Sequence, residues 1–373
     1  MKRYTAGDYL SAIDKFAPFS SADSWDNVGL LVGSPGREIS RAIVALDATH
    51  AVINQAQKDG AQLVITHHPI IFGGINSVPE CSPVYHAIKS GVAVLCAHTN
   101  LDKAGCGVNA VLAELLELDA PELLETTKTT PYRKVVVYVP RESAEAVYSA
   151  MTQAGAGRQG DYAGAAFISD GQGRFLPLEG ANPAIGSVGR LEKVEEQRLE
   201  MLAAPGDLQA VISVMRAAHP YEEPAYDILE THFDKEHTGY GRVGNLKNPL
   251  APDAFAEYVR EKLSLTGIKY VSGKEDISRV AVCGGAGCHL LEAAQKMGAQ
   301  ALISADAKHS QLLQAKDLGM TLIDAGHYGT EAVILPTLVE KLKAALPGAD
   351  IRRSDVCADP AILLTHNKET PCL

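Results

Sequence analysis

The chain has 373 residues, of which 46% are hydrophobic and 21% are charged, and these are ordinary values for a globular protein. Its formal net charge of −11, from 34 basic and 45 acidic residues, argues against a general nucleic-acid binder. No apolar run approaches the roughly 18 residues that a membrane span needs. The 7 cysteines include no Cys-x-x-Cys pair, which argues against a zinc ribbon or a disulfide framework. The N-terminus has no signal-peptide core, so we expect a cytoplasmic protein.

Short apolar runs alternate with amphipathic segments over the first third of the chain. Such runs are typical of buried strands, and the segments between them have the period of helices. The predicted elements, in chain order, are a helix over 5–16, a turn into a strand within 24–33, a strand over 42–47, a helix over 50–59, strands over 63–66 and 92–96 on either side of a helix over 84–90, and a helix over 108–118. This alternation indicates an α/β fold with a mostly parallel sheet.

The last third of the chain repeats this order. Residues 40–44 are echoed by 278–282, and residues 58–66 by 296–304 at the same offset. Gly91 to Asp102 is then matched by Gly319 to Glu331, so both halves end a strand with His-x-x-x-carboxylate. Three matching segments in the same order predict two pseudo-symmetric α/β units, residues 1–128 and 238–373, that form one core and face a shared cleft.

The segment between the two units, residues 129–237, has a different texture. It begins with a strand over 132–140, continues with a helix over 143–154 and glycine-rich hairpin-like stretches, and ends after a helix over 208–218 with His219 to Ile228. Strands and helices in this mixed order predict a small α+β domain inserted into the core.

Ligand-type side chains follow the predicted strand over 63–66. His67 and His68 come directly after it, at the carboxyl edge where open α/β sheets hold their ligands. Adjacent residues on a strand point to opposite faces, so the two imidazoles converge only if the chain bends after Thr66. Pro69 favours such a bend because it restricts His68 to extended or turn geometry.

The other two strand ends carry His98 with Asp102, and His327 with Glu331. Residues four apart share one face of a helix, so a histidine and a carboxylate at this spacing can hold one ion. Histidine and carboxylate together suit zinc, iron or manganese. Five or six such ligands are too many for one closed tetrahedral zinc, and they suit two ions with open positions that activate a water molecule. The residues therefore predict a site with two divalent metal ions per subunit.

Each of these residues also has a structural interpretation. His67 and His68 could cap a strand end, Asp102 could cap the following helix, and His327 could be a hydrogen-bonded core histidine. Each structural interpretation is favoured for a residue taken singly. Ligand types at three matched strand ends together favour the metal site.

Three further segments leave alternatives open. Trp25 is either a core anchor or part of a loop that walls the site. The segment Cys283 to Cys288 either wraps a phosphate at a helix N-terminus or is a tight packing turn. Asp306 and His309 follow the strand that echoes 63–66, where they could shape contacts around the metal ligands.

The chain resembles the Nif-three-like dinuclear-metal family, often labelled GTP cyclohydrolase 1 type 2 homologues. The resemblance is carried by Ser24 to Leu30, Thr66 to Pro69, His98 to Asp102, and Asp324 to Tyr328 with Glu331. The inserted segment is similar to the PII/CutA-like, ferredoxin-like domain of the longer bacterial members, through His219 to Pro224. One departure is Ser304-Ala305-Asp306, where members often have Thr-Gly-Asp or Thr-Gly-Glu.

The resemblance implies that the metal ligands are His67, His68, Asp102, His327 and Glu331. It implies that His98 lies outside the ligand set, and we predict for it a role as proton shuttle. It also implies a toroidal homohexamer covered by the inserted domain.

We therefore predict a metal-dependent hydrolase that acts on a nucleotide or related small molecule. The alternative is a non-catalytic protein for metal storage or delivery, or a scaffold regulated through the PII-like domain as a sensor. A nucleic-acid or transcription-partner role is disfavoured by the acidic net charge.

Overall fold

The structure is a computed structural model that describes residues 3–356 and 359–362. Contacts divide the chain into two compact units, which are Met1–Thr127 with Thr238–Leu373, and Lys128–His237. We call them the core unit and the insert unit. The strands β7 (Asp119–Pro140) and β10 (Tyr226–Leu250) contribute residues to both. No helix in the described parts of the chain is long and apolar enough to cross a membrane.

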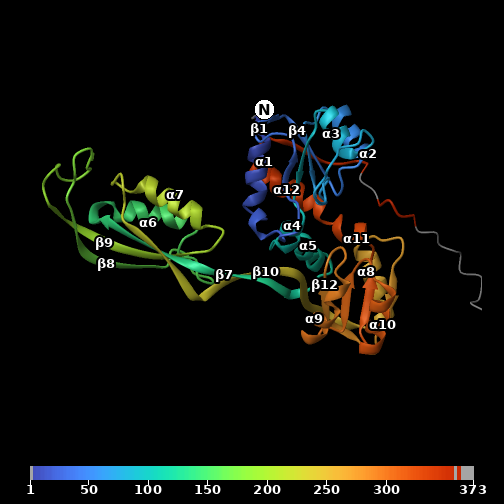
Figure 1. The fold of residues 1–373 in the computed structure, drawn as a ribbon. Coiled ribbons are helices and arrows are strands. Elements are labelled where there is room, and N and C mark those ends of the chain that lie inside the picture. The colour runs from blue at the N-terminus through green and yellow to red at the C-terminus, as the bar shows by residue number, and fades with distance from the viewer. Residues whose placement is uncertain (1–2, 357–358, 363–373) are drawn as a thin grey trace, which may run out of the picture. The chain divides into compact units, whose positions relative to one another are not determined.

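The first sheet of the core unit is parallel except at one edge. Its strand order is β15-β4-β5-β6-β2, and only β2 runs antiparallel to its neighbour. The strands are β2 (Gly29–Val32), β4 (Arg41–Ala45), β5 (Leu63–Thr66), β6 (Ala93–Cys96) and β15 (Asp350–Arg353). Because β15 comes from the C-terminal part of the chain, the two predicted α/β units share a sheet and are built into one body (Figure 1).

The second sheet has a parallel centre with antiparallel neighbours. The strands β12 (Ile277–Val282), β13 (Ala301–Ser304) and β14 (Thr321–Asp324) are parallel. The core-unit part of β10 flanks β12, and β11 (Lys269–Val271) flanks β14, both antiparallel. The three central strands of each sheet therefore follow one another along the chain in the same way.

The sequence echo corresponds to a repeated local structure. In the first sheet, Oε1 of Gln62 accepts hydrogen bonds from the backbone N–H groups of Ser40 and Arg41 and from the Ser40 hydroxyl. In the second sheet, Oε1 of Gln300 accepts the same three bonds from Ser278 and Arg279. Identical side-chain bonds at matched positions are not required by either strand alone, so they support the internal repeat.

Helices cover both sheets on both faces. The outer face of the first sheet packs on α2 (His50–Lys58) and α3 (Pro83–Lys89), and that of the second on α9 (Leu291–Lys296) and α10 (His309–Leu318). Between the sheets lies a shared apolar cluster from α1 (Ala6–Asp14), α5 (Val108–Leu115), α8 (Pro252–Lys262) and α12 (Ile334–Ala345). Burial on both faces explains why the central strands read as continuous apolar runs.

The insert unit has the element order strand, helix, strand, strand, helix, strand. These are the insert part of β7, α6 (Ala144–Gln153), β8 (Ala166–Phe175), β9 (Glu192–Ala203), α7 (Leu208–Ala218) and the insert part of β10. The sheet order is β10-β7-β9-β8. Both helices pack on one face of this sheet through one apolar cluster, and the other face has no helix on it (Figure 1). A βαββαβ unit with this strand order has ferredoxin-like topology.

The predicted strand over 132–140 is too short. β7 begins at Asp119 and has 22 residues, and its N-terminal half includes an exposed run of threonines. Threonine suits a strand, but a run with no buried face shows no alternation of hydropathy that could mark its start. β10 has 25 residues, and its exposed residues 227–230 likewise show no alternation of hydropathy.

Candidate metal centre

The carboxyl ends of β5 and β6 and the segment after β14 supply the candidate ligands. The bend predicted after Thr66 is present, since β5 ends there and the Thr66 hydroxyl donates to the carbonyl of His68 at 2.7 Å. The rings of His67 and His68 then lie with centroids 5.1 Å apart. Two short helices carry the other ligands, namely α4 (Thr99–Lys103) with Asp102 and α11 (His327–Glu331). The expected helical spacing of His327 and Glu331 is therefore present within one helix.

The six predicted site residues lie close together. Ring nitrogens of His67, His68 and His98 form one cluster, and His68, His327 and Glu331 form another, with ligand atoms within 4.8 Å of one another in each. The Nε2 atom of His67 is 3.6 Å from Oδ1 of Asp102 and 3.8 Å from Oε1 of Glu331. The other carboxylate oxygen of Glu331, Oε2, is 2.8 Å from Nε2 of His68 and 3.1 Å from Nε2 of His327. Glu331 thus lies between two groups of side chains.

All four histidines bond through Nδ1 to an oxygen that can only accept. A carbonyl or an ionised carboxylate has no proton to give, so each Nδ1 carries the hydrogen. The bonds run from His67 to the carbonyl of Ala97 (3.0 Å), from His68 to Asp47 (2.8 Å), from His98 to Asp26 (2.9 Å) and from His327 to Asp306 (2.7 Å). Each neutral ring then has its lone pair on Nε2, which is the arrangement of metal-binding histidines.

While the imidazole Nε2 atoms carry no proton, three buried ligand atoms have no hydrogen-bond partner in the described part of the chain. They are Nε2 of His67, Oδ1 of Asp102 and Oε2 of Glu331. His67 is fully buried and Glu331 is only 4% exposed. Buried polar atoms without partners are costly, and acceptors that face one another are stabilised by a shared cation. The donor set, its burial and these atoms therefore fit divalent metal ions.

The pKa shifts of these side chains also indicate that the site requires positive charge near its carboxylates. Burial and the charge of neighbouring Glu331 raise the pKa of Asp102 to about 6, against the attraction of His67. Burial alone would lower the pKa of His68, but Asp47 and Glu331 outweigh it and raise that pKa to about 10. The bond to Glu331 raises the pKa of His327 to about 9. Protons on the imidazoles thus substitute for a cation, and metal binding would release them.

The capping interpretation of Asp102 is wrong. The helix that follows, α5, has Gly107 at its N-cap with no side-chain bond, and Asp102 belongs to the preceding helix. The core-anchor interpretation of Trp25 is also wrong, because this side chain is 59% exposed. Its ring lies 6.2 Å from that of His98, so the segment borders the site.

The segment Cys283 to Cys288 is a packing turn. Its N–H groups at Gly284, Gly285 and Gly287 donate to side chains of Asn109, Thr330 and Ser304, respectively. These donors are occupied, which argues against the phosphate-binding alternative. Gly285 adjoins the site, since a Cβ there would lie 2.2 Å from Oε1 of Glu331.

The sequence did not predict which oxygens orient the histidines. Asp306 lies where a contact to the ligands was considered, and it accepts from His327, whereas His309 begins α10. In the sequence, Asp47 is the last residue of the strand predicted over 42–47, and Asp26 lies in the turn predicted within 24–33. The only sequence signal for Asp47 is its place after β4, beside the strand that ends in His67 and His68.

Comparison with known proteins identifies the family. The family described as Duf34/NIF3 (NGG1p interacting factor 3) matches residues 4–360. The chain belongs to the Duf34/NIF3 family. A Bacillus subtilis relative named "GTP cyclohydrolase 1 type 2 homolog" is 39% identical over 338 residues, 89% of this chain and 90% of that protein. A Mycobacterium tuberculosis relative of the same name is 37% identical over 367 residues, 95% of both chains.

Solved structures agree with this assignment. A Bacillus cereus protein related to NIF3 is 33% identical, with a TM-score of 0.88 over 98% of this chain and 100% of that one. Staphylococcus aureus protein SA1388 is 27% identical, with a TM-score of 0.71 over the same shares. This Duf34/NIF3 chain therefore has the mixed α/β fold of its relatives, and its histidine and glutamate clusters are candidate metal-binding groups.

Replacing Gly285 by alanine is expected to displace Glu331 and lower metal content. The backbone at Gly285 has φ of +61°, and the added Cβ would meet Oε1 of Glu331. Gly60→Ala is the matched control, because Gly60 has φ of +67° with nothing within 4 Å of a Cβ. Both variants bear backbone strain of about 1 kcal/mol, so equal metal content in the two, by elemental analysis, would contradict the prediction.

Replacing Asp47 by alanine is expected to weaken metal binding without abolishing it. The bond from Nδ1 orients His68, and loss of such a partner typically lowers metal affinity about 10- to 100-fold. Isothermal titration of the metal-stripped protein measures this change, with Asp317→Ala, an exposed carboxylate on α10, as control. Unchanged affinity in Asp47→Ala would show that the bond does not orient a ligand.

Proposed function

We propose that this protein is a dinuclear metal-dependent hydrolase that acts on a nucleotide or related small molecule. The observation that carries the proposal is the shared orientation of the four histidines, whose Nδ1 atoms are all bonded outward. The Nε2 atoms of His67, His68 and His327 then remain for ligation next to two buried carboxylates. Two divalent ions, with zinc, iron and manganese as the candidates, would activate a water molecule and stabilise developing negative charge when bound.

The ligands divide into two groups that share Glu331. We propose that one ion would be held by His67, Asp102 and Glu331, and the other by His68, His327 and Glu331. The name "GTP cyclohydrolase 1 type 2 homolog" of the relatives supports a nucleotide as the type of substrate.

His98 is proposed as the group that moves a proton. Its Nδ1 donates to Asp26, and this leaves its Nε2 free to accept a proton and return it. Burial would raise the pKa of Asp26, but the bonds from His98 and Thr99 outweigh it and lower that pKa to about 2. The ionised Asp26 holds the His98 ring in the orientation that leaves Nε2 for this role.

The test begins with metal analysis of the native protein. The stripped protein is then reloaded with the metal found and assayed against nucleotides and phosphoesters. Turnover that requires the metal, and that falls about 10²- to 10⁴-fold in His98→Gln while metal content is kept, is the expected result. A loaded protein that stays inert across the panel but exchanges metal readily would favour a role in metal storage or delivery.

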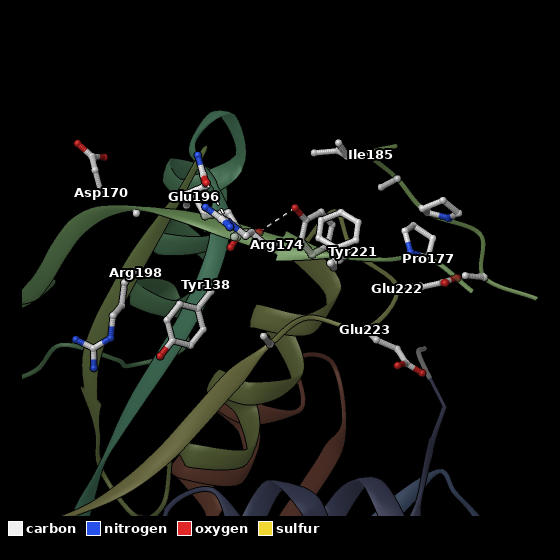
Figure 2. A pocket seen from close by; sticks show the side chains of 18 of the residues that line it. Tyr138, Asp170, Arg174, Pro177, Ile185, Glu196, Arg198, Tyr221, Glu222 and Glu223 are labelled. Carbon is white, nitrogen blue, oxygen red and sulfur yellow. Dashed lines mark hydrogen bonds between the residues drawn. The ribbon is translucent and has the colours of Figure 1, made fainter. Parts of the chain in front are cut away.

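The insert unit favours a regulatory role as the second candidate. It contains a pocket of about 600 Å³ over strands β8 and β9, next to the segment that follows α7. Figure 2 shows Tyr221 directed toward Glu196, to which its hydroxyl donates at 2.9 Å. Gly173 leaves room for this carboxylate, since a Cβ would lie 2.2 Å from Oε2 of Glu196. We propose that this domain, PII/CutA-like by sequence resemblance and ferredoxin-like in topology, is a sensor that binds a small molecule here.

The sensor role predicts that a ligand of the insert unit changes activity at the metal centre. A thermal-shift screen of small metabolites finds the ligand, and Gly173→Ala, which displaces Glu196, should weaken its binding. Gly171→Ala is the matched control on the same strand, because its Cβ would make only an ordinary contact at 3.9 Å. A small molecule that binds the insert unit but leaves metal affinity and turnover unchanged would exclude the regulatory role.

We also propose a toroidal homohexamer, on the basis of the family resemblance. Supporting it, the insert unit exposes large apolar side chains on β8, with Phe167 63% and Ile168 45% exposed. Exposed apolar residues on a strand commonly mark a protein interface. Light scattering coupled to gel filtration measures the mass directly, and a monomer at micromolar concentration would exclude the hexamer.

A further inference from the structure

Three rings form a cluster at the border of the metal centre. The ring centroids of Trp25 and Phe72 are 6.2 Å apart, and each lies within 6.2 Å of the ring of His98, at 6.2 and 6.1 Å. The side chains of Trp25 and Phe72 are 59% and 64% exposed, whereas His98 is largely buried. Two large apolar rings in contact with one another thus face solvent beside the proposed proton-transfer residue.

The exposed rings are held in place by bonds on both sides. The side chain of Asn27 donates to the carbonyl of Ile71 at 2.7 Å, which ties the segment of Phe72 to that of Trp25. Asp26, next to Trp25, accepts from His98 and from the backbone N–H of Thr99 at 3.0 Å. The segment also anchors through Asp23, whose N–H donates to the Thr99 hydroxyl. A fixed pair of exposed rings is a preformed surface for a ligand, and its binding orders few side chains.

The cluster leads directly to the candidate metal ligands. The ring of His98 lies 5.2 Å from that of His67 and 5.7 Å from that of His68, between centroids. A ligand ring in contact with Trp25 or Phe72 is therefore one imidazole away from both groups of ligands. A substituent of that ring could reach the proposed metal ions while the ring stays at the border.

We propose that Trp25 and Phe72 form the binding surface for a planar heteroaromatic ring of the substrate, such as a purine. The proposal rests on the proposed hydrolase function and assigns the part of the substrate that does not react. Aromatic side chains bind nucleobases by stacking because every base has a π-face. An aliphatic group has no such face, so the surface selects ring-bearing substrates over sugar phosphates.

The chain carries its own reporter, because Trp25 is the only tryptophan. Its fluorescence, excited at the red edge of its absorption where nucleobases do not absorb, reports stacking with no background from other tryptophans. The full-length protein, metal-loaded and metal-stripped, is titrated with guanosine, adenosine and their monophosphates, and with ribose 5-phosphate. We expect saturable quenching by the ring compounds and none by ribose 5-phosphate.

A pair of variants separates ring binding from other causes of quenching. Phe72→Ala keeps the reporter and should weaken binding of the ring compounds about 5- to 100-fold. Tyr162→Ala, which removes an exposed ring in the insert unit, should leave it unchanged. Equal affinity in Phe72→Ala and wild type, or equal quenching by ribose 5-phosphate, would overturn the proposal. So would a Trp25 that acrylamide cannot quench, because a partner copy would then cover the surface.

The outcomes of this test distinguish failure of the ring surface from failure of the proposed hydrolase function. Ring-specific quenching without hydrolysis of any compound would contradict the hydrolase and leave the binding surface standing. Metal-dependent hydrolysis that is equally fast for ribose 5-phosphate and for nucleotides, with no quenching, would support the hydrolase and exclude the ring surface. In a hydrolase that acts on nucleotides, Phe72→Ala should raise KM and change kcat little, since the ring contact is made in the ground state as well.

Discussion

Replacing Glu331 by glutamine is expected to remove both metal ions and all metal-dependent turnover. The two oxygens of this carboxylate approach different histidines, with Oε1 nearest His67 and Oε2 nearest His68 and His327. An amide keeps the shape but carries no charge, and its NH₂ group cannot be a ligand. In the proposed two-ion site Glu331 would serve both ions, so its loss should affect both, unlike loss of a ligand to a single ion.

Elemental analysis of two variants checks this difference. Glu331→Gln should retain less than a tenth of the wild-type metal after dialysis, whereas His327→Gln should lose mainly one ion of the two. Glu340→Gln on α12, an exposed carboxylate, is the control for the loss of negative charge. If Glu331→Gln keeps one equivalent of metal, the bridging role is wrong, and turnover in a metal-free variant would contradict the mechanism as a whole.

The ligand-bearing strand ends could be predicted because their signal is local. Residues 63–66 form an apolar run that stops at His67, and β5 has those bounds in the structure. The repeat then indicated that the strands ending near His98 and His327 lie at equivalent places, and β6 and β14 end at Cys96 and Asp324. Parallel strands bring their carboxyl ends to one edge of the sheet, so the residues that follow these strands come together there.

The partners of the histidines could be predicted only in part because pairing is not local. The echo of residues 63–66 placed Asp306 near the ligands, but nothing marked Asp26 or Asp47 as partners. Asp26 orients His98 from a loop 72 residues earlier in the chain, and Asp306 orients His327 from a turn 21 residues earlier. An aspartate that accepts from a histidine has the same local pattern as any aspartate in a turn. Asp306 has φ of +55°, and neither its neighbours nor their hydropathy marks that conformation.

The exposure of Trp25 is a second property that the sequence did not determine. Tryptophan is usually well buried, so the sequence left a core anchor and a loop beside the site as equal alternatives. Its neighbours Asp26 and Asn27 are polar and bond to other segments, so this turn stays at the surface. Composition alone gives the average burial of a residue type, and at a site border the average fails.

Asp102→Asn is expected to change stability in opposite directions with and without metal. In the stripped protein the ionised side chain is buried beside Glu331, and Oδ1 has no hydrogen-bond partner. A neutral isostere removes a buried charge whose burial costs more than the neighbouring imidazoles return, which should stabilise the stripped protein by about 1–3 kcal/mol. In the loaded protein the same change removes a ligand, so stabilisation by bound metal, about 4 kcal/mol at a thousandfold excess over Kd, should fall sharply.

The pH dependence of this stability difference follows from the direction of the Asp102 pKa shift. Burial raises the pKa of Asp102 in the folded state above its ordinary value, so its ionisation costs stability as pH rises from the ordinary value through the raised one. The advantage of asparagine in the stripped protein should therefore be small near pH 4 and reach its full size above about pH 6. Urea unfolding in chelator and in excess metal measures the difference in free energy of unfolding between variant and wild type in each state. The exposed Asp276→Asn is the control. A variant that is less stable than wild type in chelator at pH 7.5 would show that Asp102 has a structural role of its own.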